Sequence, residues 1–337
     1  MSANTERIVL ARGLPAWHNE NSTVLPDDAM SYETIVKYVP QVAMPVTPRQ
    51  AFYPDFEGKP HLIPDRVVNL RADGTYLGTV GNDYQAVQGS EAFGFLSELL
   101  RPNGDGLREV LADTAGTLDG GRKLFIACRA SRKFYIAGQG SEEHDGFLTF
   151  LNSFDASTKV GCVISTVRTV CENTFNANLG KHQASYWFRH TTNVLDRLEE
   201  ARQALSVAGR YWIEYERLMN EAVKAPFGQQ QWAMLLDELT VPTSKLKDLE
   251  KSNPRAFGNA TRERDELTML WINAPDVQNV KGTAYAAVQA VTAFNDHMIR
   301  GRKTETSVAE NRTRRILLDA SLKSKAWSII AEMAEIR

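Results

Sequence analysis

Five cations and three aromatic residues share one short stretch of the sequence without any acidic residue. Between Gly120 and Ala137 the cations are Arg122, Lys123, Arg129, Arg132 and Lys133, and the aromatic residues are Phe125, Phe134 and Tyr135. Strand alternation places Lys123, Phe125 and Arg129 on one face. Proteins that bind single-stranded DNA typically use cations to contact successive phosphates and aromatic rings to stack on bases. The alternative is a solvated outer face with one aromatic residue packed under a helix, which is common in antiparallel sheets.

The segment from Thr166 to Thr174 joins an alternating strand pattern to a polar cluster suited to starting a helix. Arg168 stays available on the strand, and Asn173 or Thr174 is expected to cap the first free amides of the helix. We therefore expect Arg168 and Asn173 to line a polar site at the strand end and to join the basic strand in contacting DNA. The alternative is a plain strand-to-helix corner with a solvated arginine, because helix caps are commoner than sites.

A second basic cluster lies near the C-terminus. It consists of Arg300, Arg302, Lys303, Arg312, Arg314 and Arg315. A phosphate backbone is one ligand for such a cluster. We favour the solvated face and loop of a terminal helical pair, because runs of charge usually remain in water.

Residues suited to catalysis or metal binding are scattered along the chain. The six histidines are His18, His61, His144, His182, His190 and His297. None lies in a His-Glu-x-x-His or zinc-ligand spacing, and neither a Gly-x-Ser-x-Gly motif nor a phosphate loop is present. We expect no metal, no cofactor and no hydrolase or ATPase activity. An enzyme pocket around Asn152, Asp155, Arg168 and Asn173 is the least supported interpretation, because an Asx-type turn explains the first two residues.

Composition places the chain among ordinary globular proteins. It has 337 residues, 43% of them hydrophobic, and a formal net charge of -2, so any nucleic-acid site has to be local. No apolar run approaches the roughly 20 residues that cross a bilayer, and the first residues lack a secretory pattern. Three cysteines without a Cys-x-x-Cys spacing indicate reduced thiols. We expect a cytosolic protein without a membrane partner.

The spacing of apolar and turn residues divides the chain into three parts. Residues 1–66 are rich in proline, which should limit regular structure to a short helix near Asp28 to Tyr38. Residues 67–190 predict an α+β core with a hairpin around Gly74, a helix from Glu91 to Leu100 and an antiparallel meander. Residues 191–337 carry helical spacing interrupted by prolines. The expected fold class is α+β, with an N-terminal antiparallel sheet, packed helices and a mainly helical C-terminal half.

The individual elements follow from the same spacing. Strands are expected at 107–118, 123–130, 133–137, 146–151 and 159–171, and C-terminal helices at 195–219, 229–240, 244–252, 262–271, 282–298 and 311–336.

Six short pieces occur in a defined order along the chain. They are Pro15-Ala16-Trp17-His18, Leu77-Gly78-Thr79-Val80, Thr114-Ala115-Gly116-Thr117-Leu118, Leu151-Asn152-Ser153, Val167 to Thr174, and Gly282-Thr283-Ala284-Tyr285 running to His297. In this order they resemble a large uncharacterised family of phage/plasmid-like proteins found on bacterial mobile elements. That family usually reads His-Asp-Gly-Ser where this chain has Phe154-Asp155-Ala156-Ser157, which argues against catalysis by this loop. The resemblance implies a bacteriophage or related source, the cytoplasm of the bacterial host, and a setting in DNA metabolism.

Two functions from different classes follow. The leading one is a phage-encoded protein that binds and anneals single-stranded DNA in recombination or replication, similar in architecture to single-strand annealing recombinases. Annealing needs no ATP, which agrees with the missing phosphate loop, and self-association into a ring or filament would supply a continuous groove. The alternative is a phage structural or host-protein-binding module without nucleic-acid activity, in which the helical half docks a partner.

Overall fold

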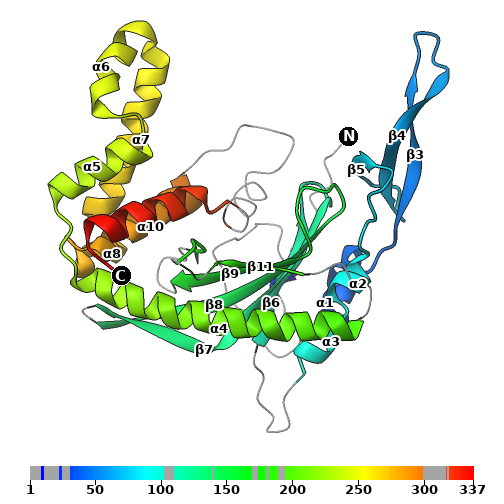
Figure 1. Cartoon of the computed structure of the whole chain (residues 1–337), viewed down its shortest axis with the longest axis horizontal. Helices are drawn as coiled ribbons and strands as arrows, with labels where there is room; N and C mark the ends of the chain where they lie inside the picture. The colour runs from blue at the N-terminus through cyan, green and yellow to red at the C-terminus, as the bar shows by residue number, and fades with distance from the viewer. Residues whose placement is uncertain are drawn as a thin grey trace.

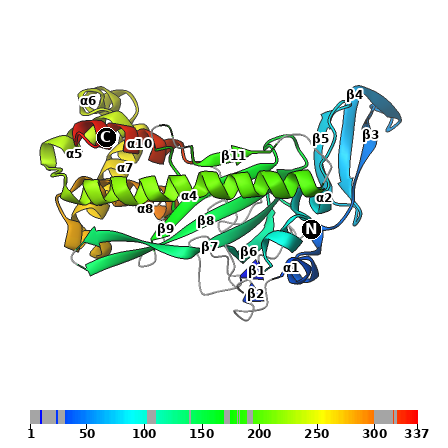
Figure 2. The same ribbon diagram turned by 60° about the horizontal axis from the view of Figure 1, so that its bottom comes forward.

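A long helix lies across an antiparallel sheet in the computed structural model of the chain (Figures 1 and 2). The structure describes residues 9–10, 23–24, 31–101, 110–138, 140–168, 174–179, 181, 183–188, 194–298, 316 and 319–337. Strands are concentrated in the N-terminal half and helices in the C-terminal half. The predicted α+β class is therefore confirmed.

The main sheet is built around the predicted meander. Its central strands are β6 (Val110–Leu118), β7 (Lys123–Gly138), β8 (Gly140–Ser153) and β9 (Gly161–Arg168), paired antiparallel in sequence order. Short strands extend it: β10 (Thr174–Phe175) and β11 (Ser185–Trp187) pair with β9, while β1 (Val9–Leu10) pairs with β6 and β2 (Thr23–Val24). The two strands expected at 123–130 and 133–137 are one strand, with a register irregularity between Arg129 and Lys133.

Both faces of β7 are buried, in two separate clusters. Leu124, Ile126 and Cys128 face the main core, which includes the inner side of α4. Phe125 and Ala127 face a smaller cluster that also contains Ile316. The alternation expected from the sequence is present, but neither face of this part of the strand is a solvated outer surface.

Helix α4 (Val194–Lys224) supplies the layer that covers the main core. Ala201, Ala204, Ala208 and Tyr211 recur at helical spacing and are fully buried. Gly146 on β8 allows the close approach, because a Cβ atom there would lie 2.6 Å from the Trp212 ring. The helix predicted at 195–219 is confirmed.

A second sheet contradicts the expectation for the proline-rich segment. Strands β3 (Val46–Pro54), β4 (Pro60–Arg71) and β5 (Tyr76–Gly81) pair antiparallel, and β3 and β4 form a long hairpin (Figure 1). Prolines fit because β3 is an edge strand of this sheet and Pro64 lies in an irregular part of β4, between the pairs Phe52–Leu62 and Gln50–Val67. The predicted boundary after residue 66 falls inside β4. The turn around Gly74, with φ of 84°, is as predicted.

Short helices connect the two sheets. Helix α1 (Tyr32–Tyr38) is capped by Ser31 and confirms the predicted short helix. It is followed by the 3₁₀ turn η1 (Pro40–Val42). The helix predicted from Glu91 to Leu100 is two pieces, α2 (Gly89–Phe93) and α3 (Leu96–Leu99). They are separated at Gly94, a residue that weakens helices.

The C-terminal half is helical, as predicted. It contains α5 (Gln229–Leu239), α6 (Thr243–Ser252), α7 (Pro254–Asn273), the 3₁₀ segment η2 (Pro275–Val280), α8 (Ala284–Ala293), the π-helical turn η3 (Phe294–Met298) and α10 (Ser321–Met333). Helix α7 starts eight residues before the predicted 262 because Asn253 caps it and Pro254 fits its first turn. Of the helices described, none is long and apolar enough to cross a membrane.

Candidate functional site

The cations of the predicted DNA-binding strand are largely neutralised in the fold. Lys123 is buried and forms an ion pair with Asp119. Arg129 lies 3.7 Å from a carboxylate oxygen of Asp113 on β6 and 3.7 Å from one of Asp145 on β8. Asp113 and Asp145 come from neighbouring strands and Asp119 from the turn before β7, so the local absence of acids did not produce a basic surface.

Two more of the predicted site residues are also occupied by contacts within the chain. The Lys133 ammonium lies 2.6 Å from the Glu143 carboxylate. Arg122 is exposed, and its guanidinium lies 5.8 Å from the centre of the Tyr76 ring.

The aromatic part of the prediction is wrong for Phe125. Its side chain is fully buried with Leu118 and Phe147, and in this position it has no face for a base. Tyr135 is 49% exposed. The side chains of Arg132 and Arg168, all of Asn173, and the C-terminal basic cluster at residues 300–315 lie outside the described residues.

Two of the predicted residues, Lys123 and Arg168, are also far apart along the sheet. Lys123 is paired with Ser153, whereas Arg168 is paired with His144. His144 and Ser153 are nine residue steps apart along β8, which corresponds to about 30 Å. Asn152 lies at the Ser153 end, so it does not share a pocket with the Arg168 end of β9. Asp155 accepts from the Ser157 amide at 3.0 Å, which is the Asx-type turn named as the alternative.

Three adjoining hollows form a continuous groove along β11, the edge strand next to β9. Their volumes are about 650, 510 and 450 Å³. The first two share Thr158, Lys159 and Trp187, and the last two share Asn178 and Ser324. The groove therefore runs from the loop at Tyr84, past β11, to helix α10.

Trp187 is the aromatic residue at the junction of the two larger hollows. Its side chain is 41% exposed, although tryptophan usually packs inside. Gly161 sets the position of its backbone: Trp187 pairs with Gly161, and a Cβ atom at Gly161 would lie 2.4 Å from the Tyr186 carbonyl oxygen and 2.7 Å from the Trp187 ring. A side chain at residue 161 would displace the edge strand that presents the ring.

Polar and basic groups line the rest of the groove. Lys159 and Lys181 are exposed, one in the hollows beside Trp187 and one in the hollow beside α10. Asn176 and Asn178 lie between them. The Asn178 side-chain oxygen accepts from the Ala184 amide at 2.9 Å, which fixes its orientation. The described lining of the groove thus combines the exposed Trp187 ring, the cations of Lys159, Lys181 and Arg337, the acids Asp83 and Glu214, and oriented amides, a set suited to holding an extended polar chain.

Catalytic groups do not gather in the described part of this groove. No cluster of three metal-ligating side chains occurs among the described residues. The thiols of Cys128 and Cys162 are buried in strands, and burial raises the pKa of Cys162 to about 12 and that of Cys128 further still. Neither sulfur is a thiolate at neutral pH.

Sequence reasoning did not select Trp187, Lys159 or Lys181. A signal was present in Ser185-Tyr186-Trp187, a short aromatic strand pattern between the meander and the long helix. No local sequence pattern indicates the groove, because its lining residues are scattered between positions 83 and 337.

A buried ion pair joins two of the segments that carried the family resemblance. The Asp296 carboxylate in the π-helical turn lies 2.8 Å from the Lys323 ammonium of α10, and both side chains are fully buried. Asp296 accepts from the Thr174 amide at 2.8 Å, and Lys323 donates to the Thr174 carbonyl at 2.6 Å. Thr174 belongs to strand β10, so the helix start predicted at this position is wrong.

A second buried polar contact connects the same layers. His144 on β8 lies between two hydroxyl groups, with 3.2 Å from its Nδ1 to Tyr215 of α4 and 3.1 Å from its Nε2 to Tyr285 of α8. Tyr285 belongs to the Gly282-Thr283-Ala284-Tyr285 piece. These contacts fix the helical half on the sheet beside the groove.

The fold and the groove define an α+β protein with an open groove along β11 and no cluster of three metal-ligating side chains among its described residues. Comparison with known families matches residues 76–317 to the family described as "Domain of unknown function (DUF932)". This match covers more than half of the chain, so the chain belongs to this uncharacterised family. Neither the curated proteins nor the solved structures give a match.

Proposed function

We propose that this protein binds single-stranded nucleic acid in the groove along β11. The observation that carries the proposal is the exposed Trp187 ring, shared by two hollows and flanked by Lys159. Stacking of a base on an aromatic ring tolerates any sequence, because every base has a π-face. Lys159 beside the ring and Lys181 further along the groove then neutralise phosphates of the same strand.

The chemistry of the groove supports an extended strand over a small ligand. Its three hollows follow one another in series, and its two exposed lysines lie in different hollows. Oriented amides and hydroxyl groups along the walls, such as Asn178 and Ser324, offer hydrogen bonds to bases and sugars. A single nucleotide would use only one of these hollows.

The biological setting belongs to the same proposal. We expected a similarity to single-strand annealing recombinases because of one architectural feature, a helix packed on an antiparallel sheet. We place the protein in recombination or replication of a bacteriophage or related mobile element, in the cytoplasm of the bacterial host. Annealing would require self-association that aligns grooves into a ring or filament, and mass photometry with and without single strands tests this step.

Binding of a labelled oligothymidine at about 50 mM salt tests the groove, because phosphate contacts are strong under this condition. Trp187→Ala should weaken binding by about 5- to 150-fold, the equivalent of about 1–3 kcal/mol for one stacked base. Lys159→Ala and Lys181→Ala should each make the salt dependence shallower by about 0.7 on a log–log scale.

Tyr135→Ala is the matched control, because Tyr135 is similarly exposed and lies on β7 outside the groove. It should bind like the wild type. A loss with Tyr135→Ala but not with Trp187→Ala would contradict the groove and favour the basic strand. Failure of the wild-type protein to bind single strands would contradict the function itself.

One observation favours the second candidate, a protein-binding module of the phage. The β3–β4 hairpin presents Phe52, Tyr53, Phe56 and Leu62, each more than half exposed. Exposed apolar groups in a cluster mark contact sites for other proteins. A phage or host protein that co-purifies with the wild type but not with Phe52→Ser/Phe56→Ser would support this candidate.

A further inference from the structure

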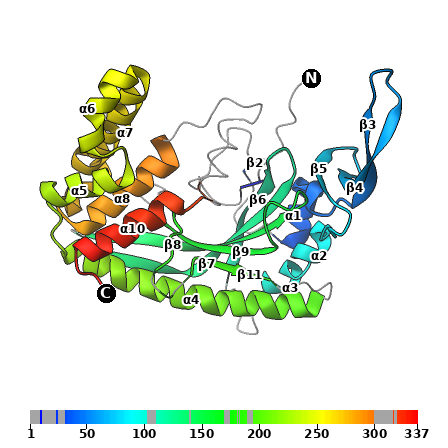
Figure 3. The same ribbon diagram turned by 45° about the horizontal axis from the view of Figure 1, so that its top comes forward.

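Two helices at the far end of the helical half form a prong with a concentration of positive charge. We define the prong as residues 243–262, which comprise α6 and the first part of α7 and project away from the sheet (Figures 1 and 3). Its exposed cations are Lys245, Lys247, Lys251, Arg255 and Arg262. Against the carboxylates of Asp248 and Glu250, they give the prong a formal charge of +3 in a chain whose net charge is -2.

These five cations are available for a ligand. Within the part of the chain that the structure describes, none of them forms an ion pair, and Arg262 donates one hydrogen bond to Asn259 at 3.0 Å. Lys123, Arg129 and Lys133 of the predicted strand, in contrast, each lie beside a carboxylate. The prong therefore carries a cluster of available positive charge. The sequence had predicted such a cluster on strand β7 instead.

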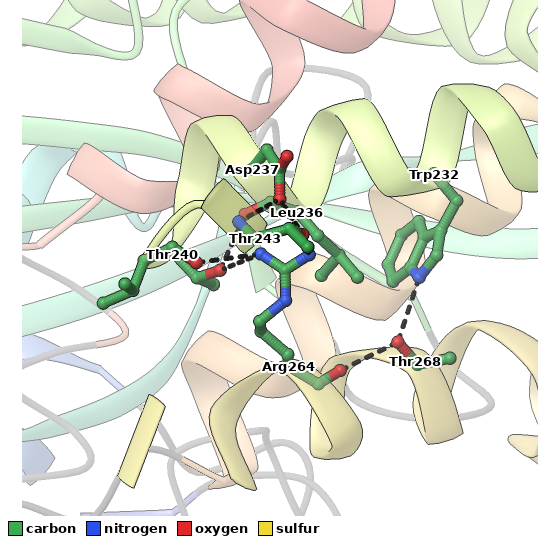
Figure 4. Close-up of polar contacts among 8 residues, drawn as sticks. Trp232, Leu236, Asp237, Thr240, Thr243, Arg264 and Thr268 are labelled. Atoms are coloured by element: carbon green, nitrogen blue, oxygen red, sulfur yellow. Dashed lines mark hydrogen bonds and ion pairs between the residues drawn. The ribbon is translucent and has the colours of Figure 1, made fainter. Parts of the chain in front are cut away.

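The base of the prong is held by a polar knot around Arg264 (Figure 4). Its guanidinium donates at 3.0 Å to the Val241 carbonyl and to the Thr240 and Thr243 hydroxyls, and it lies 2.8 Å from the Asp237 carboxylate. Burial alone would raise the pKa of Asp237, but hydrogen bonds from Thr243 and Arg264 outweigh it and lower the pKa.

Aromatic packing continues this anchor. Trp232 stacks on Trp271 with ring centres 4.7 Å apart, and its indole N–H donates to the Thr268 hydroxyl at 3.1 Å. Both contacts join α5 to α7 below the prong. The prong is therefore carried on a fixed support, so its cations keep their spacing.

We propose that the prong binds the phosphate backbone of double-stranded nucleic acid, as a second contact beside the single-strand groove. Arg255 and Arg262 lie two turns apart on α7, about 10 Å along the helix axis. Cations spread over such a length match successive phosphates of a polymer better than one phosphate ion. The aromatic residue of the prong, Phe257, is partly buried, so the prong contacts the backbone without stacking on bases.

The choice of nucleic acid rests on the proposed function of the groove, and one helix connects the two surfaces. Ser324 of α10 lines the groove. One residue further, Lys325 of α10 donates to the Glu238 carbonyl at the end of α5, which precedes the prong. A nucleic acid with a duplex and a single-stranded tail would engage both surfaces, as at a site where strands pair.

The test compares three labelled ligands: a blunt duplex, a single strand, and a duplex with a single-stranded tail. Lys247→Glu/Lys251→Glu/Arg255→Glu removes three prong cations. Duplex binding by this variant should show a log–log salt dependence shallower by about 3, because each duplex phosphate that a cation neutralises contributes about 0.9. Its binding to single strands should equal that of the wild type, whereas Trp187→Ala should show the reverse pattern.

The matched control is Arg49→Glu/Lys59→Glu/Arg66→Glu, which makes the same charge change at three exposed positions of the β3–β4 hairpin. It should bind the duplex like the wild type. An equal loss in both triple variants would overturn the proposal, because net charge would then set the affinity. Absence of duplex binding by the wild-type protein at about 50 mM salt would also overturn the proposal.

Two further outcomes separate the hypotheses. If the protein binds the duplex through the prong but does not bind single strands, duplex binding by the prong stands and single-strand binding by the groove is rejected. Competition by polyglutamate as effective as that by the duplex would overturn the nucleic-acid assignment in favour of an acidic protein partner.

Discussion

Asp296 and Lys323 form an ion pair 2.8 Å long with no exposed surface on either side chain. The pair also binds the backbone of one strand residue, because Asp296 accepts from the Thr174 amide and Lys323 donates to its carbonyl. A π-helical turn, the terminal helix and a sheet-edge strand are thereby joined at one point. Buried pairs are costly to form and costly to break, so this contact defines how the helical half docks.

Removing one partner of this pair should destabilise the protein strongly. Lys323→Met leaves the Asp296 carboxylate buried and uncompensated, which costs about 3–5 kcal/mol of the free energy of unfolding. Adding Asp296→Asn should recover part of the loss, because it removes the charge while its amide oxygen still accepts from Thr174. Urea unfolding of the two variants measures this difference.

Glu332→Gln serves as the control on the same helix, because Glu332 is exposed. Its effect should stay within about 0.5 kcal/mol, as for most surface changes. An unchanged unfolding midpoint for Lys323→Met would show that the pair does not hold the two halves together.

Stability at low pH should depend on Asp73 in the turn between β4 and β5. Hydrogen bonds from Arg71 lower the pKa of Asp73 to about 2. Because the unfolded pKa is higher, about 4, the folded state gains stability above that pH and loses it as the pH falls from about 4 to 2. Asp73→Asn should therefore flatten the acid limb of the stability curve in this range. Asp248→Asn on α6 makes the same change of charge and is the control. An equal flattening in this variant would show that the acid sensitivity does not come from Asp73.

Periodicity predicted most of the fold because each element buries a face at its own spacing. Helix α4, the meander and the Gly74 turn follow from residues that are neighbours in sequence. The β3–β4 hairpin was missed because a proline in an edge strand costs no ladder hydrogen bond, and an edge position depends on the tertiary fold.

The candidate site was predicted poorly for a similar reason. Charges counted along β7 gave a basic strand, but Asp113 and Asp145 are brought beside Arg129 only by the pairing of β6, β7 and β8. Burial of Phe125 on the second face of the sheet also depends on a residue as distant as Ile316. The prong shows the opposite case: Asp248 and Glu250 interrupt its cations in sequence, yet they form no ion pair with them in the described fold.

Native thiols in the sheet should resist modification. Cys128 and Cys162 are fully buried, and burial raises the pKa of the Cys162 thiol to about 12. A Cys171→Ser variant isolates these two, and an aromatic disulfide reagent at neutral pH should not react with it until denaturant is added. Rapid reaction of the native variant would contradict the burial of both strands.

The prong should lose its support when Arg264 is shortened. Arg264→Leu leaves Asp237 without its ion pair and the loop from Thr240 to Thr243 without three hydrogen bonds. We expect a loss of about 1.5–3 kcal/mol, typical of hydrogen bonds to a charged group, and faster amide exchange in α6 with unchanged exchange in α4.

Arg264→Lys should recover only part of this loss, because an ammonium cannot reproduce the planar fork of donors. Arg262→Leu, two residues away and exposed, is the control and should leave exchange in α6 unchanged. Equal exchange in Arg264→Leu and wild type would show that the knot does not fix the prong. Because the cations contact duplex phosphates only when their spacing is kept, Arg264→Leu should also weaken duplex binding although it lies outside the prong.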